Sequence, residues 1–88
     1  MKAVVTVIGK DKVGIIAAVA QKLHEYGLNI EDISQTVMQD FFTMMMLVDV
    51  TGIEDFSALS QSLECMGREI GVTIHVQHED IFNSMHKN

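Results

Sequence analysis

The chain has no proline, no low-complexity tract and no linker in its 88 residues. This length is that of one domain, with no room for a second core. Folding at this size buries roughly 60–65% of the chain's surface, so a lone copy is only marginally stable. Almost half of the residues are apolar, which is ample for a core. We expect one domain over residues 1–78, followed by a polar C-terminal tail, 79–88, with a helical turn around Ile81 and Phe82.

Basic residues are few: 6 Lys and Arg stand against 12 Asp and Glu, for a net charge of −6. Proteins that bind nucleic acid or anionic membranes present basic surfaces, so we expect neither partner. No apolar run reaches membrane-spanning length, and the N-terminus lacks the shape of a signal peptide. The single cysteine, Cys65, excludes an internal disulfide. These features favour a cytoplasmic protein.

Residue patterns that would support catalysis or metal binding are missing. No nucleophile stands beside a recognisable base. The carboxylate pairs Glu31-Asp32, Glu54-Asp55 and Glu79-Asp80 fall at element boundaries, where solvation or helix capping explains them better than acid–base chemistry. His75 and His78 are an odd step apart on an extended segment, so they point to opposite faces. We therefore expect no enzyme, no catalytic residue, no metal site and no cofactor.

Hydrophobic periodicity divides the chain into strands and helices. Strands are predicted over residues 3–8, 28–38, 41–50 and 72–77, with an irregularity around Glu31-Asp32 and a hairpin at Gln39-Asp40. Helices are predicted over residues 13–26 and 55–70, with Asp55 as a cap and Gly27 and Gly71 as stops. The helix faces expected to be buried comprise Ile16, Val19, Ala20 and Leu23 in the first, and Phe56, Leu59, Leu63, Met66 and Ile70 in the second.

The predicted order of elements is βαββαβ, and its two halves contain similar sequences. Gly27-Leu28-Asn29-Ile30 in the first half resembles Gly71-Val72-Thr73-Ile74 in the second. This duplication predicts an α+β, ferredoxin-like sandwich: a four-stranded antiparallel sheet with two helices on one face. The handedness of the crossovers places strands 3–8 and 41–50 in the centre.

Such a fold leaves one face of the sheet uncovered. On that face Val4 and Ile8, or Met45 and Leu47, would meet water. An apolar patch of this kind usually marks an interface. We therefore expect self-association, with a homodimer as the simplest form.

The segment between the first strand and the first helix is the candidate binding site. Residues 9–14, Gly-Lys-Asp-Lys-Val-Gly, leave the strand and open the helix. The backbone N–H groups of a first helical turn lack partners within the helix and favour a carboxylate or a phosphate. Gly14 is expected to permit both close packing of the helix on the sheet and approach of a ligand to the backbone.

Two motifs resemble those of a known family. Residues 9–17, GKDKVGIIA, are similar to the D-[KR]-P-G-[IL]-[IVL]-A loop of ACT domains, with Val13 where many relatives have proline. Residues 27–30, GLNI, resemble the G-x-N-I element that begins their second strand. The resemblance covers nearly the whole chain apart from the tail. It is strongest with small stand-alone ACT proteins and with the leading ACT domain of glycine-cleavage repressor-like proteins.

The resemblance implies a non-enzymatic regulatory module that binds an amino acid or similar small metabolite at an interface between two copies. Carried over to this chain, the ligand-binding residues are Asp11, Val13, Gly14, Ile15, Asn29 and Ile30. Asp11 is a helix cap or an acceptor for a ligand ammonium, and Asn29 either satisfies backbone groups or binds the ligand. The alternative is a ligand-free module for dimerisation or for docking on a metabolic enzyme or regulator.

Overall fold

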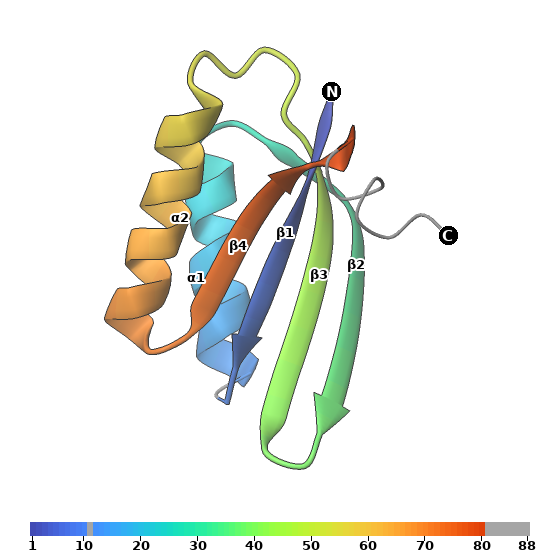
Figure 1. Ribbon diagram of the computed structural model, residues 1–88, viewed down its shortest axis with the longest axis vertical. Helices are drawn as coiled ribbons and strands as arrows, with labels where there is room; N and C mark the ends of the chain where they lie inside the picture. Colours follow the sequence, from blue (N-terminus) through green and yellow to red (C-terminus); the bar gives the residue numbers. More distant parts are fainter. Residues whose placement is uncertain (11, 81–88) are drawn as a thin grey trace.

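The computed structural model describes residues 1–10 and 12–80, with side chains for all of these except Lys12 and Val13. Six elements follow one another along the chain: β1 (Lys2–Gly9), α1 (Lys12–Glu25), β2 (Asn29–Met38), β3 (Phe41–Asp49), α2 (Phe56–Ile70) and β4 (Thr73–His78). The four strands form one sheet, and both helices lie against the same side of it (Figure 1). The predicted ferredoxin-like βαββαβ sandwich is confirmed.

The strand order in the sheet is β2-β3-β1-β4, and every neighbouring pair is antiparallel. The two strands predicted to be central, β1 and β3, are central. The predicted irregularity in β2 is a shift of register between Ile30 and Asp32. Because β2 and β1 are both antiparallel to β3, they run in the same direction, a relation that matters for the site.

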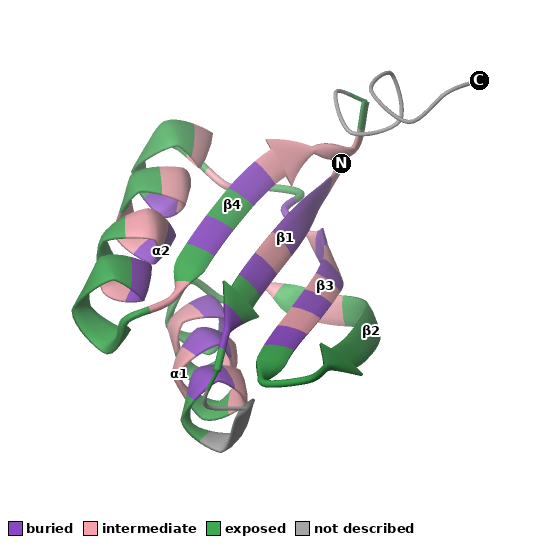
Figure 2. Cartoon of the chain, turned by 60° about the horizontal axis from the view of Figure 1, so that its bottom comes forward, coloured by how far each residue is buried: buried purple, intermediate pink, exposed green. Residues whose placement is uncertain are grey.

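The core lies between the helices and one face of the sheet. Figure 2 shows buried residues alternating with less buried ones along β3, the pattern of a strand with one covered face. β1 has three successive buried residues, Ala3 to Val5, before it alternates. The strands contribute Val5, Val7, Met44 and Met46, and the helices contribute Val19, Leu23, Leu59 and Leu63. β2 contributes least, because all of its residues except Ile30 are exposed.

The predicted helix ends are confirmed by their hydrogen bonds. The Asp55 carboxylate accepts a hydrogen bond from the Ala58 N–H at 3.1 Å, which caps α2. Gly27 and Gly71 have φ angles of 73° and 81°, in the left-handed region that favours glycine at a helix end. After α1, the Gly27 N–H donates to the His24 carbonyl at 2.9 Å. These caps return the chain toward the sheet after each helix.

Two predictions of burial are wrong. Ile70 is 43% exposed at the end of α2, although Gly67 in the same last turn is buried against Val72 and Ile74. Val4, expected to meet water, is only 7% exposed, whereas Ile8 on the same face is 42% exposed. Met45 and Leu47, which share that face, are partly buried. The helical turn predicted around Ile81 and Phe82 lies outside the part of the chain that the structure describes.

Candidate functional site

The segment between β1 and α1 lies at one end of the sheet. β1 ends at Gly9 and α1 begins at Lys12, with Gly14 exposed in its first turn. Asp11 is not among the described residues, and Val13 is described only by its backbone. Ile15 is 2% exposed and belongs to the core. Its side chain therefore packs inside the domain, and the expectation that it lines a surface site is not supported.

Gly9 is the glycine that allows close packing at this end. A Cβ atom added there would lie 2.4 Å from Val72 Cγ1 and 2.8 Å from Ile15 Cδ1. These distances are far below van der Waals contact. Gly14, to which the sequence assigned this role, is exposed. Gly9 therefore has a packing role at this end that was not predicted from the sequence, while the roles predicted for Gly14 stay predictions.

Asn29 and Ile30 lie at the opposite end of the sheet. Asn29 is paired with Asp49, which is paired in turn with Lys2 at the start of β1, whereas Gly9 at its end is paired with Phe42. The two ends of this eight-residue strand are about 23 Å apart at about 3.3 Å per residue. One copy of the chain therefore does not bring Gly14 and Asn29 together.

A hollow of about 520 Å³ lies at the same end of the sheet as the β1–α1 segment. It is lined by Lys10, Val37, Gln39, Asp40 and Phe42. The hollow offers an ammonium, a carboxylate and a side-chain amide beside apolar groups. That set of groups complements a small zwitterion.

Lys10 is held near this hollow by an aromatic ring. Its Nζ atom lies 5.7 Å from the centroid of the Phe41 ring, within the range of a cation–π contact. The motif comparison did not point to Lys10 or to the β2–β3 turn as candidate site residues. The predicted hairpin could have indicated these residues. Gly9 at the end of β1 is paired with Phe42, so the turn that precedes Phe42, with Gln39 and Asp40, lies at the same end of the sheet.

β2 forms an edge of the sheet and is open to an additional strand. It pairs with β3 on one side only. Its last six residues, 33–38, contain no charge, no proline and no glycine. Two of its apolar side chains, Ile33 and Val37, are 41% and 59% exposed. An edge with these properties favours pairing with another strand.

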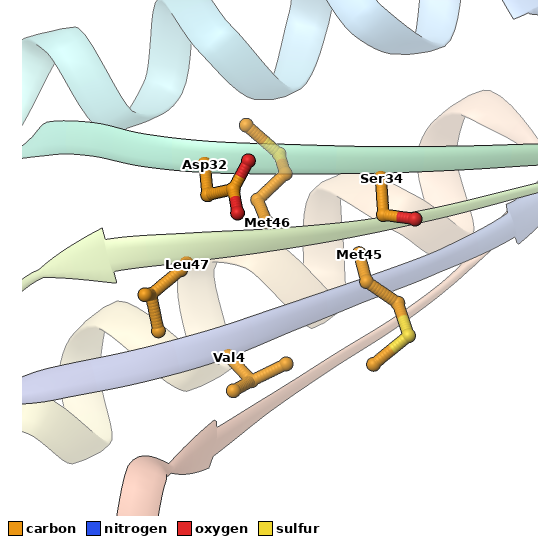
Figure 3. A pocket seen from close by; sticks show the side chains of 6 residues that line it. All are labelled: Val4, Asp32, Ser34, Met45, Met46 and Leu47. Carbon is orange, nitrogen blue, oxygen red and sulfur yellow. The ribbon is translucent and has the colours of Figure 1, made fainter.

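A second hollow, of about 190 Å³, lies on the uncovered face of the sheet. It is lined by Val4, Asp32, Ser34, Met45, Met46 and Leu47. Figure 3 shows Val4, Met45 and Leu47 extending to one side of the sheet and Met46 extending to the other. The floor of this hollow is apolar, and β2 supplies the polar side chains at its edge.

The titratable groups of the described residues do not form a cluster of metal ligands. Nowhere in residues 1–10 and 12–80 do three His, Cys, Asp or Glu side chains gather as metal ligands would. His78 packs against Phe56 with ring centroids 5.0 Å apart and the ring planes tilted by 44°. His75 pairs instead with Thr6, whose side chain faces away from the helices. A hydrogen bond from Thr51 lowers the pKa of Asp49, and a hydrogen bond to Glu31 raises the pKa of Lys2. Both shifts are explained by surface pairs far from the β1–α1 segment.

Comparison with known proteins identifies the class. The family model for the ACT domain matches residues 2–77. A UPF0237 family protein of Listeria innocua is 52% identical over 88 residues, which span 99% of each chain. An ACT domain protein of Streptococcus pneumoniae superposes with a TM-score of 0.84 and 49% identity, with 93% of each chain covered. The chain therefore belongs to the ACT domain family and is similar to its small stand-alone members.

The predicted likeness to glycine-cleavage repressors is a likeness of fold. A structure described as a putative glycine cleavage system transcriptional repressor superposes with a TM-score of 0.78 at 16% identity. The match covers 86% of this chain and 45% of that one. In residues 1–10 and 12–80, no helix is both long enough and apolar enough to cross a membrane.

Proposed function

We propose that the chain is a non-enzymatic regulatory module that binds an amino acid or a similar small metabolite at an interface between two copies. The observation that carries this proposal is the separation of Gly14 and Asn29 at opposite ends of the sheet, combined with the open edge of β2. A ligand that uses both residues must take them from two chains.

Pairing of two β2 edges supplies that arrangement. In a two-fold symmetric, antiparallel pair, the start of each β2 lies beside the end of the other. Asn29 of one copy is then carried toward Met38 and the β2–β3 turn of its partner. That turn borders the hollow beside the β1–α1 segment. The hollow of each copy is thus closed by residues at the start of the other copy's β2.

The groups around the hollow define how a ligand is held. The ligand carboxylate faces the backbone N–H groups from Val13 to Ile15, with Lys10 nearby. Its ammonium meets Asp11, Asp40 or the side-chain oxygen of Asn29. Ile30 contributes only an apolar contact, since it is already packed in part against the core.

A thermal-shift screen of the proteinogenic amino acids tests the proposal. The true ligand raises the melting temperature in a saturable way, because binding to the folded state alone stabilises it by about 2.7 kcal/mol at 100 times Kd. Amino acids that do not bind leave the melting temperature unchanged and serve as internal controls. A uniform absence of shift would instead favour the ligand-free module for dimerisation or docking on an enzyme or regulator.

A further inference from the structure

The uncovered face of the sheet is apolar at the end where β1 begins. Val4 is paired with Leu47 on one side and with Gln77 on the other, and Met45 lies one row further along β3. Val4 is 7% exposed although α1 and α2 both lie on the other side of the sheet. The hollow beside it, about 190 Å³, has room for one large apolar side chain. This end of the face can therefore accommodate an apolar side chain from another segment.

The chain leaves β4 beside this hollow. His78, the last residue of β4, is paired with Ala3, one row beyond the pairing of Gln77 with Val4. Glu79 and Asp80 then already have a helical backbone. Phe82 follows His78 by four residues, a separation of about 6 Å in a helix and about 13 Å when extended. Residues just beyond Asp80 are thus within reach of Val4 and its neighbours.

The sequence beyond Asp80 matches the hollow in polarity. Ile81, Phe82 and Met85 are spaced i, i+1 and i+4, a spacing that a helix continuing from Glu79 and Asp80 would bring to one face. The same eight residues include His86 and Lys87 and no acidic residue. The hollow carries the Asp32 carboxylate at its edge. The apolar and basic residues of the segment 81–88 therefore complement the apolar floor and the acidic edge of the hollow.

We propose that residues 81–88 dock on the uncovered face of their own chain, with Phe82 seated over Val4, Met45 and Leu47. Docking covers the part of this face that the sequence alone assigned to self-association, where Met45 and Leu47 are only partly buried. The face is then occupied by the chain itself, and β2 is left as the edge for a second copy. The segment thereby determines which surface of the domain is available to partners.

Methyl NMR of the full chain tests this docking. The chain has 7 methionines, and a Met45→Leu variant identifies the ε-methyl signal of Met45. A Phe82 ring over Met45 shifts that signal upfield through its ring current. Phe82→Leu keeps an apolar side chain but removes the ring, so the signal should return toward the position of an exposed methionine.

The matched control is Asn83→Ala, which alters the neighbouring residue and keeps Ile81, Phe82 and Met85. We expect it to leave the Met45 signal where it is. A Met45 signal that is the same with and without the Phe82 ring would overturn the proposal. A shift that grows with protein concentration would also overturn it, because a second copy would then occupy the face.

Discussion

Leu63→Ala should lower the free energy of unfolding by about 2–5 kcal/mol, as expected for a large side chain removed from a packed core. Leu63 is fully buried between α2 and the sheet. A domain of this size has a total stability of about 5–13 kcal/mol. The loss is therefore a large share of the total, and the urea midpoint of the variant should fall well below that of the unaltered protein. Urea titration followed by circular dichroism measures it.

Ile70→Ala is the matched control on the same helix. Sequence periodicity puts Ile70 on the buried face of α2 with Leu63, but the structure leaves it 43% exposed. Its truncation should cost less than about 1 kcal/mol, since little apolar surface returns to water. Equal losses in the free energy of unfolding for the two variants would show that Ile70 is packed as closely as Leu63, contrary to the structure.

Gly9→Ala should destabilise the protein by about 1–3 kcal/mol, the usual cost of forcing an extra group into a packed site. The added Cβ would lie 2.4 Å from Val72 Cγ1, on a branched and stiff side chain. The end of β1, the first turn of α1 and the start of β4 would have to separate. The same urea titration measures this loss.

Gly14→Ala is the corresponding control. It makes the same chemical change at an exposed position inside a helix, where alanine is favoured over glycine by about 0.5–1 kcal/mol. The two substitutions should therefore change stability in opposite directions. A loss of stability in Gly14→Ala as large as that in Gly9→Ala would show that Gly14 is also closely packed.

Most of the fold was predictable because local pattern and connectivity agree. Alternation of apolar residues defined the strands, glycines marked both helix ends, and the similarity between the two halves indicated the sheet order. The exposure of Ile70 was not predictable from periodicity. A helical repeat identifies the face of α2 to which Ile70 belongs, but it contains no information on how far each residue of that face is buried.

The site was predictable in part. The motifs indicated Gly14 and Asn29, but similarity of motifs does not measure the distance between them. The predicted topology did contain that information, since β1 and β2 run in the same direction and the end of one must lie far from the start of the other. The hollow beside Lys10 and Asp40 depends on side-chain placement in three segments, which no single stretch of sequence encodes.

A mixing experiment tests most directly whether the site is shared between two copies. Gly14→Val blocks approach to the first turn of α1, so this variant alone should bind the amino acid found in the screen much more weakly. Asn29→Ala removes hydrogen bonds worth about 1–3 kcal/mol, so it should weaken binding by about 5- to 150-fold. When the two variants are mixed in equal amounts and exchange subunits, half of the dimers contain one chain of each variant. Each of these mixed dimers has one intact site. Calorimetry should then recover about a quarter of the wild-type binding capacity at wild-type affinity. Recovery of no high-affinity sites from a mixture shown to exchange subunits would contradict a site built from Gly14 of one copy and Asn29 of the other.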